Sequence, residues 1–364
     1  MGNDAQLYYI TLGAVRHIVP RWITLGLSSM VPTAMFQSQE PHFADHRDQY
    51  FSNSLDFELL GDRTKNAQFV MALGSQPLSW LSLGMGVTLS THARTRTSVF
   101  VSEATGKAPP LVAPNISIQS AFVPHASFTL LPLDGLLVTG AFHWKYSNPV
   151  HTDHRQTMWY SGGKDDAATS YTYTFDYGFQ PIRGSLGVSY QVPDRSGVSL
   201  TLATGVRYSL WSQYRDRMGQ APTLPWKNTL SPSLGLAGVF AKVHQVHLDS
   251  LYVPSPVPQQ TGRSNYVDNH RLALAAAYRF TFPMGSRTGS VSAHVQVHRL
   301  IRRSHTKDMS SADPVIDEFP EARDARTGEI IPDSLGFQTN NPGYPGFSSE
   351  GTIISTGLSF GMGF

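Results

Sequence analysis

The chain has 364 residues and a nearly balanced formal net charge of +2, so its composition favours neither nucleic acid nor an acidic partner. It contains no cysteine, which excludes disulfide scaffolds, thiolate metal sites and cysteine nucleophiles. No run approaches the ~18 apolar residues that a membrane helix needs, which leaves strands as the means by which this chain could span a bilayer.

Taken in chain order, apolar residues alternate with small or polar residues over about thirteen segments that turn residues separate. This alternation predicts β-strands, because successive side chains of a strand point to opposite faces of the sheet. The predicted strands span residues 5–18, 23–36, 67–75, 81–97, 115–131, 136–146, 171–192, 197–211, 227–239, 245–254, 271–282, 290–300 and 351–364. No composition shift divides them, so we expect a single domain over residues 1–364.

The predicted strand 171–192 opens with an aromatic residue at every second position from Tyr171 to Phe179. Such a row predicts an aromatic girdle at a membrane interface. The apolar positions then shift by one, which predicts a β-bulge near Gln180 and Pro181. The polar stretch before this strand, residues 147–169, is expected to be a loop.

The last strand has an apolar face that includes Ile354, Leu358 and Phe360, and an opposite face of glycine and serine. In a soluble sheet such a strand would be an aggregation hazard, whereas it is the expected closing strand of an outer-membrane barrel. The connections are short after residues 18, 75, 131, 192, 239 and 282 and longer between these turns, as periplasmic turns and external loops are. The sequence therefore predicts an all-β fold, a transmembrane antiparallel β-barrel of the bacterial outer membrane.

The strand count itself is informative. If Phe364 lies at the periplasmic end, the strands 351–364 and 5–18 both run toward the periplasm. Bacterial single-chain barrels have an even number of antiparallel strands. We therefore expect one further strand before residue 5, which would bring the thirteen strands to a natural count of fourteen.

Two stretches carry a family resemblance. Residues 252–258 read Tyr-Val-Pro-Ser-Pro-Val-Pro and are followed by Thr-Gly-Arg-Ser-Asn-Tyr-Val-Asp-Asn-His-Arg at 261–271, while residues 341–347 read Asn-Pro-Gly-Tyr-Pro-Gly-Phe. They resemble the late extracellular hairpin and the C-terminal end of the FadL/TodX family, outer-membrane transporters of long-chain fatty acids and hydrocarbons. The final strand is also similar to the C-terminal recognition strand of outer-membrane proteins.

The resemblance implies a fourteen-stranded, monomeric barrel in outer-membrane lipid, plugged by a small N-terminal hatch. It also implies transport of long-chain fatty acids or similar hydrophobic small molecules, and recognition of the C-terminal strand by the barrel assembly machinery. The signal peptide, the hatch and the first strand of the family have no counterpart here, because strand-like sequence follows Met1 almost at once.

The inner face of the predicted strands supplies the candidate binding residues. The alternation places polar side chains there at His92, Arg94, Arg96, His143, Lys145, Asp176, Arg207, His247, Asp249, Arg279, His294, Gln296 and His298. Inward apolar side chains are expected at Val70, Leu137, Trp211, Leu251 and Val253. Arginine and lysine bind carboxylates through charge-assisted hydrogen bonds, and an apolar slot suits an alkyl chain.

The residues expected to bind substrate are therefore Arg207, Lys145, His143, Arg279, Trp211, Leu137 and Val253. The alternative is that the polar groups only solvate a hydrated lumen.

Pro32 is a further candidate, because proline removes a ladder donor within a strand. In the family, a kink in the third strand opens a lateral hole from the lumen to the bilayer. If one strand precedes residue 5, the segment 23–36 is the third strand, and Pro32 would mark the lateral opening. The alternative is that Pro32 simply ends this strand at its outer rim.

Other functions remain open as alternatives. A passive pore or an adhesive barrel needs no specific site. An outer-membrane lipase could use His125 and Ser127 on one strand face, although no acid is obviously placed behind His125. His151 and His154 could bind a metal from a loop, whereas His294 and His298 lie about 13 Å apart on a strand, too far to chelate one ion. We expect no catalytic site, no metal and no cofactor.

Overall fold

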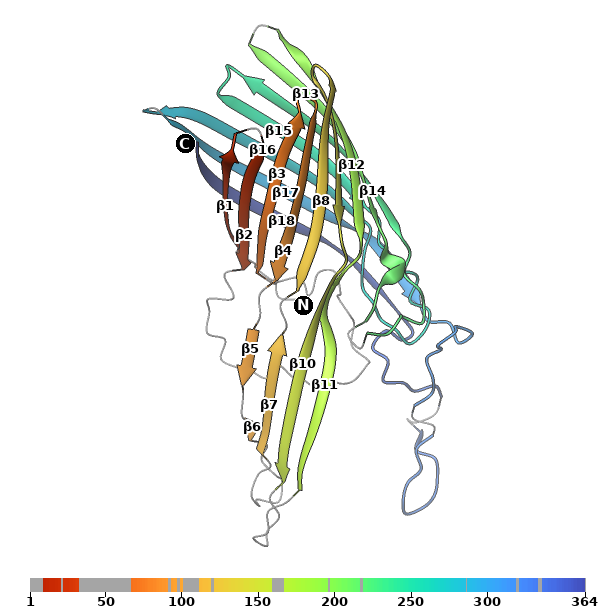
Figure 1. Cartoon of the computed structure of the whole chain (residues 1–364). Coiled ribbons are helices and arrows are strands. Elements are labelled where there is room, and N and C mark those ends of the chain that lie inside the picture. Colours follow the sequence, from red (N-terminus) through yellow and green to blue (C-terminus); the bar gives the residue numbers. More distant parts are fainter. Residues whose placement is uncertain are drawn as a thin grey trace.

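The computed structural model describes residues 9–20, 22–32, 67–90, 93–96, 99–100, 111–118, 121–158, 167–195, 197–216, 219–285, 287–318, 321–332 and 336–363. Thirteen strands form one antiparallel sheet that curves into the wall of a barrel (Figure 1). They are β1 (Tyr9–Val19), β2 (Ile23–Pro32), β3 (Gln68–Leu78), β4 (Leu81–Ser90), β8 (Phe122–Leu133), β9 (Leu136–His143), β12 (Arg183–Arg195), β13 (Val198–Ser209), β14 (Thr229–Phe240), β15 (His244–Val253), β16 (Arg271–Met284), β17 (Arg287–Thr306) and β18 (Gly346–Gly363). Each pairs with the next in this order, so the all-β, antiparallel prediction of about thirteen strands is confirmed.

The connections between wall strands sort by length as predicted. Short turns join β1 to β2, β3 to β4, β8 to β9, β12 to β13, β14 to β15 and β16 to β17, and they lie at the top of Figure 1. One of them is the two-residue turn Asp134–Gly135, in which Gly135 has a φ of 78°, a conformation that other residues rarely adopt. The long connections meet at the opposite end, which we call the loop end.

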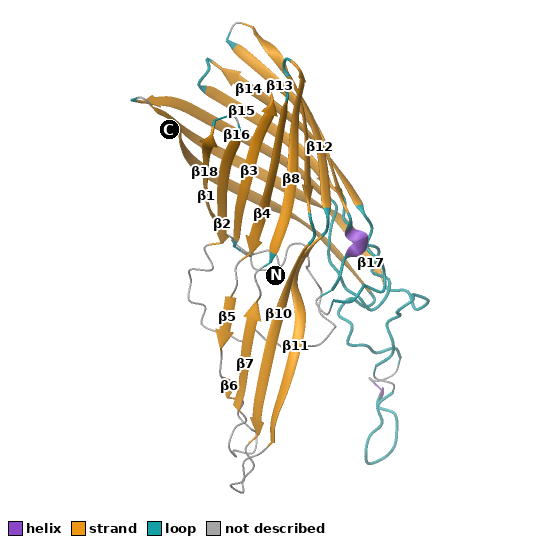
Figure 2. Cartoon of the chain, viewed as in Figure 1, coloured by secondary structure: helices purple, strands orange, loops and turns teal. Residues whose placement is uncertain are grey.

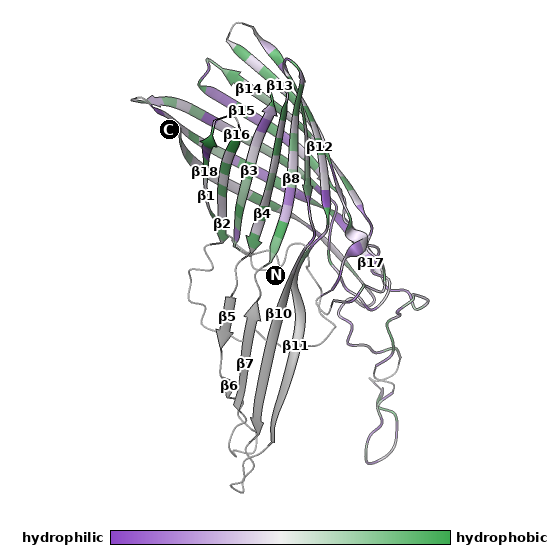
Figure 3. Cartoon of the chain, viewed as in Figure 1, coloured by the Kyte–Doolittle hydropathy of each residue, from purple (hydrophilic) through white to green (hydrophobic). Residues whose placement is uncertain are grey.

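The faces of the wall are chemically distinct, and banding along the strands is visible in Figure 3. On β18, Ile354 and Leu358 are 67% and 85% exposed and belong to the apolar face. Their partners Val297 and Ala293 on β17 continue that face, because residues opposite each other in a ladder point the same way. The other face carries Ser355, glycines and the polar side chains discussed below. In a membrane barrel the apolar face is the outer one and the polar face lines the lumen.

A second sheet extends beyond the loop end of the wall (Figure 2). Its strands are β5 (Ala93–Arg96), β6 (Val99–Phe100), β7 (Leu111–Ile118), β10 (Tyr146–Met158) and β11 (Ala167–Gln180). It pairs in the order β11, β10, β7, β5, with β6 also bonded to β7. Several predicted wall strands are thus divided between two sheets.

The second sheet corrects several sequence predictions. The predicted strand 115–131 is divided between β7 of the second sheet and β8 of the wall. The single strand 171–192 is wrong, because it is broken at Pro181 and Ile182 into β11 and β12. Proline has no backbone N–H to donate to a ladder, so a break at this position is favoured where a bulge was expected. The row from Tyr171 to Phe179 therefore lies on β11 and forms no girdle on the wall. The expected loop 147–169 contains most of β10, and β4 ends at Ser90 well before residue 97.

Glycines on the lumen face make room for polar side chains of the neighbouring strand. Gly357 pairs with His294, and a Cβ at Gly357 would collide with the imidazole ring. Gly86 pairs with His125 in the same way. The small face read from the sequence is therefore required by cross-strand packing as well as by a hydrated lumen.

Gly357→Val should destabilise the barrel by about 1–3 kcal/mol, because the added side chain overlaps the ring of His294 in a packed position. Urea unfolding of the refolded protein in lipid would measure the loss. Gly351→Val is the matched control on the same strand and face, since its Cβ would meet Leu300 at an ordinary 3.5 Å. Equal losses of stability in the two variants would show that the clash with His294 is not the cause of the effect.

The sheet order ends at β1 and β18. Among the residues that the structure describes, these two strands share no backbone pairing. The described residues also contain no helix that is long and apolar enough to cross a membrane.

Candidate functional site

Four basic side chains gather on the lumen face near the loop end of β8, β9, β12 and β13. His125, His143 and Arg183 are successive partners in the ladder, so they point to the same face. The rings of His125 and His143 lie 5.5 Å apart between centroids. Arg207 is offset by two residues along β13, where it pairs with Ser185 of β12. We call these four residues the basic cluster.

No carboxylate neutralises the basic cluster within the described residues. The Arg183 guanidinium donates from Nη2 to Oε1 of Gln180 at 3.0 Å, while its Nε and the Nδ1 of His125 are buried and find no hydrogen-bond partner among the residues described. His143 and Arg207 have no hydrogen bond or ion pair in the described part of the chain, although the charges of Arg183, His125 and Arg207 all act on His143. Unpaired cations on a lumen wall are suited to an anion, because charge-assisted hydrogen bonds to a carboxylate are the strong ones.

An aromatic cluster lies next to the basic cluster, formed by Phe179, Trp211, Tyr214, Trp226 and Tyr266. The rings of Tyr214 and Trp226 stack at 3.7 Å, and Phe179 meets Trp211 at 6.2 Å. Tyr214 and Trp226 are only 2% and 3% exposed.

The chain itself joins the two clusters. Phe179 immediately precedes Gln180, the acceptor of the Arg183 guanidinium, and Trp211 lies two residues beyond Ser209, the ladder partner of Arg183. The short 3₁₀ helix η3 (Trp211–Gln213) turns the chain so that Trp211 reaches both Phe179 and Trp226. Apolar and cationic groups therefore adjoin at one end of the lumen.

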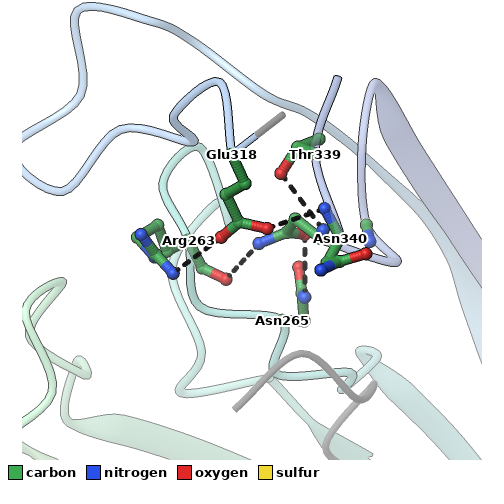
Figure 4. A network of polar contacts seen from close by, with 7 residues as sticks. Arg263, Asn265, Glu318, Thr339 and Asn340 are labelled. Carbon is green, nitrogen blue, oxygen red and sulfur yellow. Dashed lines mark hydrogen bonds and ion pairs between the residues drawn. The ribbon is translucent and has the colours of Figure 1, made fainter. Parts of the chain in front are cut away.

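The long loops at this end are held by a partly buried polar network (Figure 4). Arg263 donates to Oε1 of Glu318 at 3.1 Å, and the other carboxylate oxygen of Glu318 accepts from the backbone N–H of Asn340 at 2.8 Å. Asn265 donates to Oδ1 of Asn341 at 3.0 Å, and Asn341 donates to the carbonyl of Arg263 at 2.8 Å. The network ties the 254–270 connection to the segment before β18, over a sequence separation of more than seventy residues.

Lys307 closes the same network. Its ammonium donates to the carbonyls of Gly262 and Ser264 at 2.7 and 2.9 Å and to Oδ1 of Asn265 at 2.7 Å. Burial lowers the pKa of Lys307 to about 8. All three protons of a protonated lysine are used, so the connection after β15 is pinned to the end of β17.

The structure separates the predicted substrate-binding residues into two groups. His143, Arg207, Trp211 and Val253 lie near the loop end, and Lys145 is exposed in the gap between β9 and β10. Leu137 and Arg279 lie near the short turns at the other end of the wall. These positions follow from the register of the wall strands.

The remaining inner-face predictions divide in a similar way. His247, Asp249, Arg279, His294 and Gln296 line one concave site on β15 to β17. Arg94, Arg96 and Asp176 lie on β5 and β11 of the second sheet and not on the barrel wall, while His92 lies outside the described residues. Pro32 is the last residue of β2 and pairs with Tyr9, whereas the β2–β3 ladder stops at Met30.

Sequence reasoning missed Arg183 and the aromatic cluster. Arg183 could have been found from the apolar positions after the break at Pro181, because Leu186, Val188 and Tyr190 leave Arg183 and Ser185 on the inner face. The aromatic cluster carries no such signal. Tyr214, Trp226 and Tyr266 come from irregular segments that only the tertiary structure brings together.

Neither a metal centre nor a hydrolase site is apparent in the described part of the chain. No three His, Asp or Glu residues among those described gather closely enough to hold a metal ion. His125 lies on the same inward face as Ser127, but its ring neighbour is His143 and not an acid. His151 and His154 lie on β10 of the second sheet.

Comparison with solved structures places this fold among known barrels. The structure matches that of a Pseudomonas aeruginosa FadL homologue with a TM-score of 0.54, over 97% of this chain and 76% of that chain, at 15% sequence identity. The chain has a FadL-like fold. The recognised resemblance to the FadL/TodX family is thereby confirmed at the level of the fold.

Two further structures are similar to the FadL-like fold of this chain. The P. putida toluene transporter TodX matches with a TM-score of 0.48 over 96% of this chain and 81% of its own, at 11% identity. The CymD monoaromatic hydrocarbon channel matches with a TM-score of 0.46 over 81% and 82%, at 9% identity. No protein-family model and no curated protein matches the sequence.

Proposed function

We propose that this protein carries long-chain fatty acids or similar hydrophobic molecules across the bacterial outer membrane through the lumen of its barrel. The FadL-like fold and the apolar outer face support a location in the membrane. The site supports the substrate class, because it combines cations without carboxylate partners and an adjoining aromatic cluster. The adjacency of these two clusters is the observation that carries the proposal.

The two clusters suit the two ends of an amphiphile. The carboxylate would lie against Arg183 and Arg207, which have no carboxylate partner among the described residues, with the His143 ring beside them. The alkyl chain would pack on aromatic rings such as Trp211, because apolar area removed from water contributes about 25 cal/mol per Å². A hydrocarbon without a carboxylate could only pack on the aromatic rings. The protein is a transporter in this proposal and not an enzyme.

Lateral exit into the bilayer is part of the same proposal, with Pro32 as its marker. Pro32 lies at the end of β2, where the ladder to β3 has already stopped. A residue without an N–H cannot donate to that ladder, so Pro32 adds no hydrogen bond between β2 and β3 at this rim. The C-terminal strand β18, with its apolar face, is the proposed contact of the barrel assembly machinery, and the barrel is proposed to act as a monomer in lipid.

The purified barrel is expected to bind palmitate and pentadecane, two probes that share an alkyl chain. Arg207→Ala should weaken palmitate binding by about tenfold or more, because a hydrogen bond to a charged group contributes roughly 1.5–3 kcal/mol, while pentadecane binding changes little. Lys145→Ala should act in the same direction, and more weakly because this side chain is exposed and outside the basic cluster. Equilibrium binding in detergent with both probes measures the difference.

Arg299→Ala is the matched control, since this arginine lies on the outer face and bonds to Glu350 and Thr352. It should leave both affinities unchanged. If Arg207→Ala weakens the two probes equally, the arginine supports the wall and does not bind the carboxylate. If neither probe binds the wild-type protein, the transport proposal itself is wrong.

A further inference from the structure

A second concave site lies on the lumen wall, away from the basic cluster, and its floor is made of alanine. On β16 the inward residues Ala275 and Ala277 have long polar neighbours on both sides. Asp249 of β15 and Gln296 of β17 flank Ala275, while His247 and His294 flank Ala277. Because a methyl group is much shorter than these side chains, the flanking residues rise higher from the sheet than the alanines and border an open depression of about 340 Å³.

The site contains one acid and one fixed cation. Asp249 lies beside Ala275, and Arg279 lies four residues from Ala275 along β16, toward the short turns. The backbone positions of these two residues are about 14 Å apart along the strand direction, at ~3.4 Å per residue. The long arginine side chain can close part of this distance.

Neither charge is neutralised. Within the described residues, Asp249 and Arg279 form no ion pair and no hydrogen bond with each other or with any other side chain. His247 and His294 have no hydrogen-bond partner there either, and Gln296 contacts only His298, at 3.4 Å. The site thus presents two opposite, separated charges together with neutral hydrogen-bonding groups.

We propose that this alanine-floored site binds a small zwitterion of the α-amino-acid class. Its carboxylate accepts hydrogen bonds from the Arg279 guanidinium, and its ammonium donates to the Asp249 carboxylate. A ligand with one charge would pair with one of these residues and leave the other unpaired, whereas a zwitterion pairs with both. Gln296 and His294 then hydrogen-bond to the polar side chain of the ligand. The barrel would thereby take a polar solute at a place that the amphiphile of the loop end does not use.

The test is calorimetric titration of the detergent-solubilised, full-length protein with L-glutamine, acetate and methylamine. Acetate carries only the carboxylate of L-glutamine and methylamine carries only its ammonium, so we call these two probes half-ligands. The wild-type protein should bind L-glutamine saturably and more tightly than either half-ligand. Arg279→Gln and Asp249→Asn should each weaken L-glutamine binding by tenfold or more.

The two variants should also change selectivity in opposite directions. In Asp249→Asn the Arg279 guanidinium is the only remaining charge of the site, so the affinity for acetate should rise relative to that for L-glutamine. In Arg279→Gln the Asp249 carboxylate remains, so the affinity for methylamine should rise relative to that for L-glutamine. His17→Gln, a lumen-face substitution on β1, is the control and should leave all three affinities unchanged. Heat-modifiable migration on gels confirms that each variant is folded.

Three results would overturn the proposal. They are an absence of saturable L-glutamine binding to the wild-type protein, an equal affinity for L-glutamine and for one half-ligand, and a loss of L-glutamine binding in both variants without the opposite shifts in selectivity. The first two need only the wild-type protein, so they hold even if a variant fails to fold. None of them depends on whether palmitate binds at the loop end.

Discussion

Trp226→Ala is expected to lower the free energy of unfolding by about 3–5 kcal/mol, the largest effect of any single substitution that we consider. Trp226 is 3% exposed, its ring stacks on Tyr214 at 3.7 Å, and it meets Tyr266 edge-on at 5.4 Å. Removing it leaves a cavity in the middle of the aromatic cluster, which the neighbouring rings can only partly fill. Urea unfolding of the barrel refolded into lipid would measure the loss.

Two variants frame this result. Trp80→Ala removes the same side chain from a short turn, where it is 49% exposed, and should cost far less. Trp226→Phe keeps an aromatic ring in place and removes an indole N–H that has no hydrogen-bond partner in the described part of the chain, so it should be milder than the alanine variant. If Trp80→Ala and Trp226→Ala cost the same, the aromatic cluster is not a packed core.

Lys307→Met should be the second most damaging change, because the apolar side chain leaves three oxygen acceptors in the loop network without their donor. These are the carbonyls of Gly262 and Ser264 and the side-chain oxygen of Asn265. A buried acceptor left unsatisfied costs roughly 1–3 kcal/mol, and the three together should detach the connection after β15 from the end of β17. Protease cleavage within residues 254–270 would report the detachment, with Lys242→Met in an exposed turn as the control.

The effect should also depend on pH, with a definite sign. Burial lowers the pKa of Lys307 to about 8 in the folded chain, below the ~10.4 of an unfolded lysine. Between these values the unfolded chain binds more protons, so the stability of the wild-type protein gains from this group as the pH rises from about 8 toward 10. Lys307→Met lacks this gain, so the stability difference between the two proteins should widen over that range. A difference that narrows instead would mean that burial does not depress this pKa.

Local patterning was enough to determine the wall of the barrel. The alternation on β18, with Ile354 and Leu358 opposite Ser355 and Gly357, assigns both faces without reference to any other strand. A strand has a side-chain period of two, so this information is present in each segment separately. The number of wall strands, the sorting of turns and loops and the inward position of Arg207, Asp249 and Arg279 follow from it.

What only the tertiary structure decided depends on contacts between distant segments. The division of 171–192 between two sheets is one case, since both halves alternate and only their ladder partners differ, β10 for one and β9 and β13 for the other. The aromatic cluster is another, because Tyr214, Trp226 and Tyr266 lie in segments without any periodicity.

The alanine-floored site is a third. Asp249 and Arg279 can be assigned to the lumen from the sequence, but their meeting in one site depends on the register between β15 and β16, which sets Asp249 beside Ala275, four residues from Arg279. The alternation of a strand excludes a slip of one residue, which would exchange its two faces, but a slip of two residues keeps both faces, and only the pairing of the strands decides between those registers.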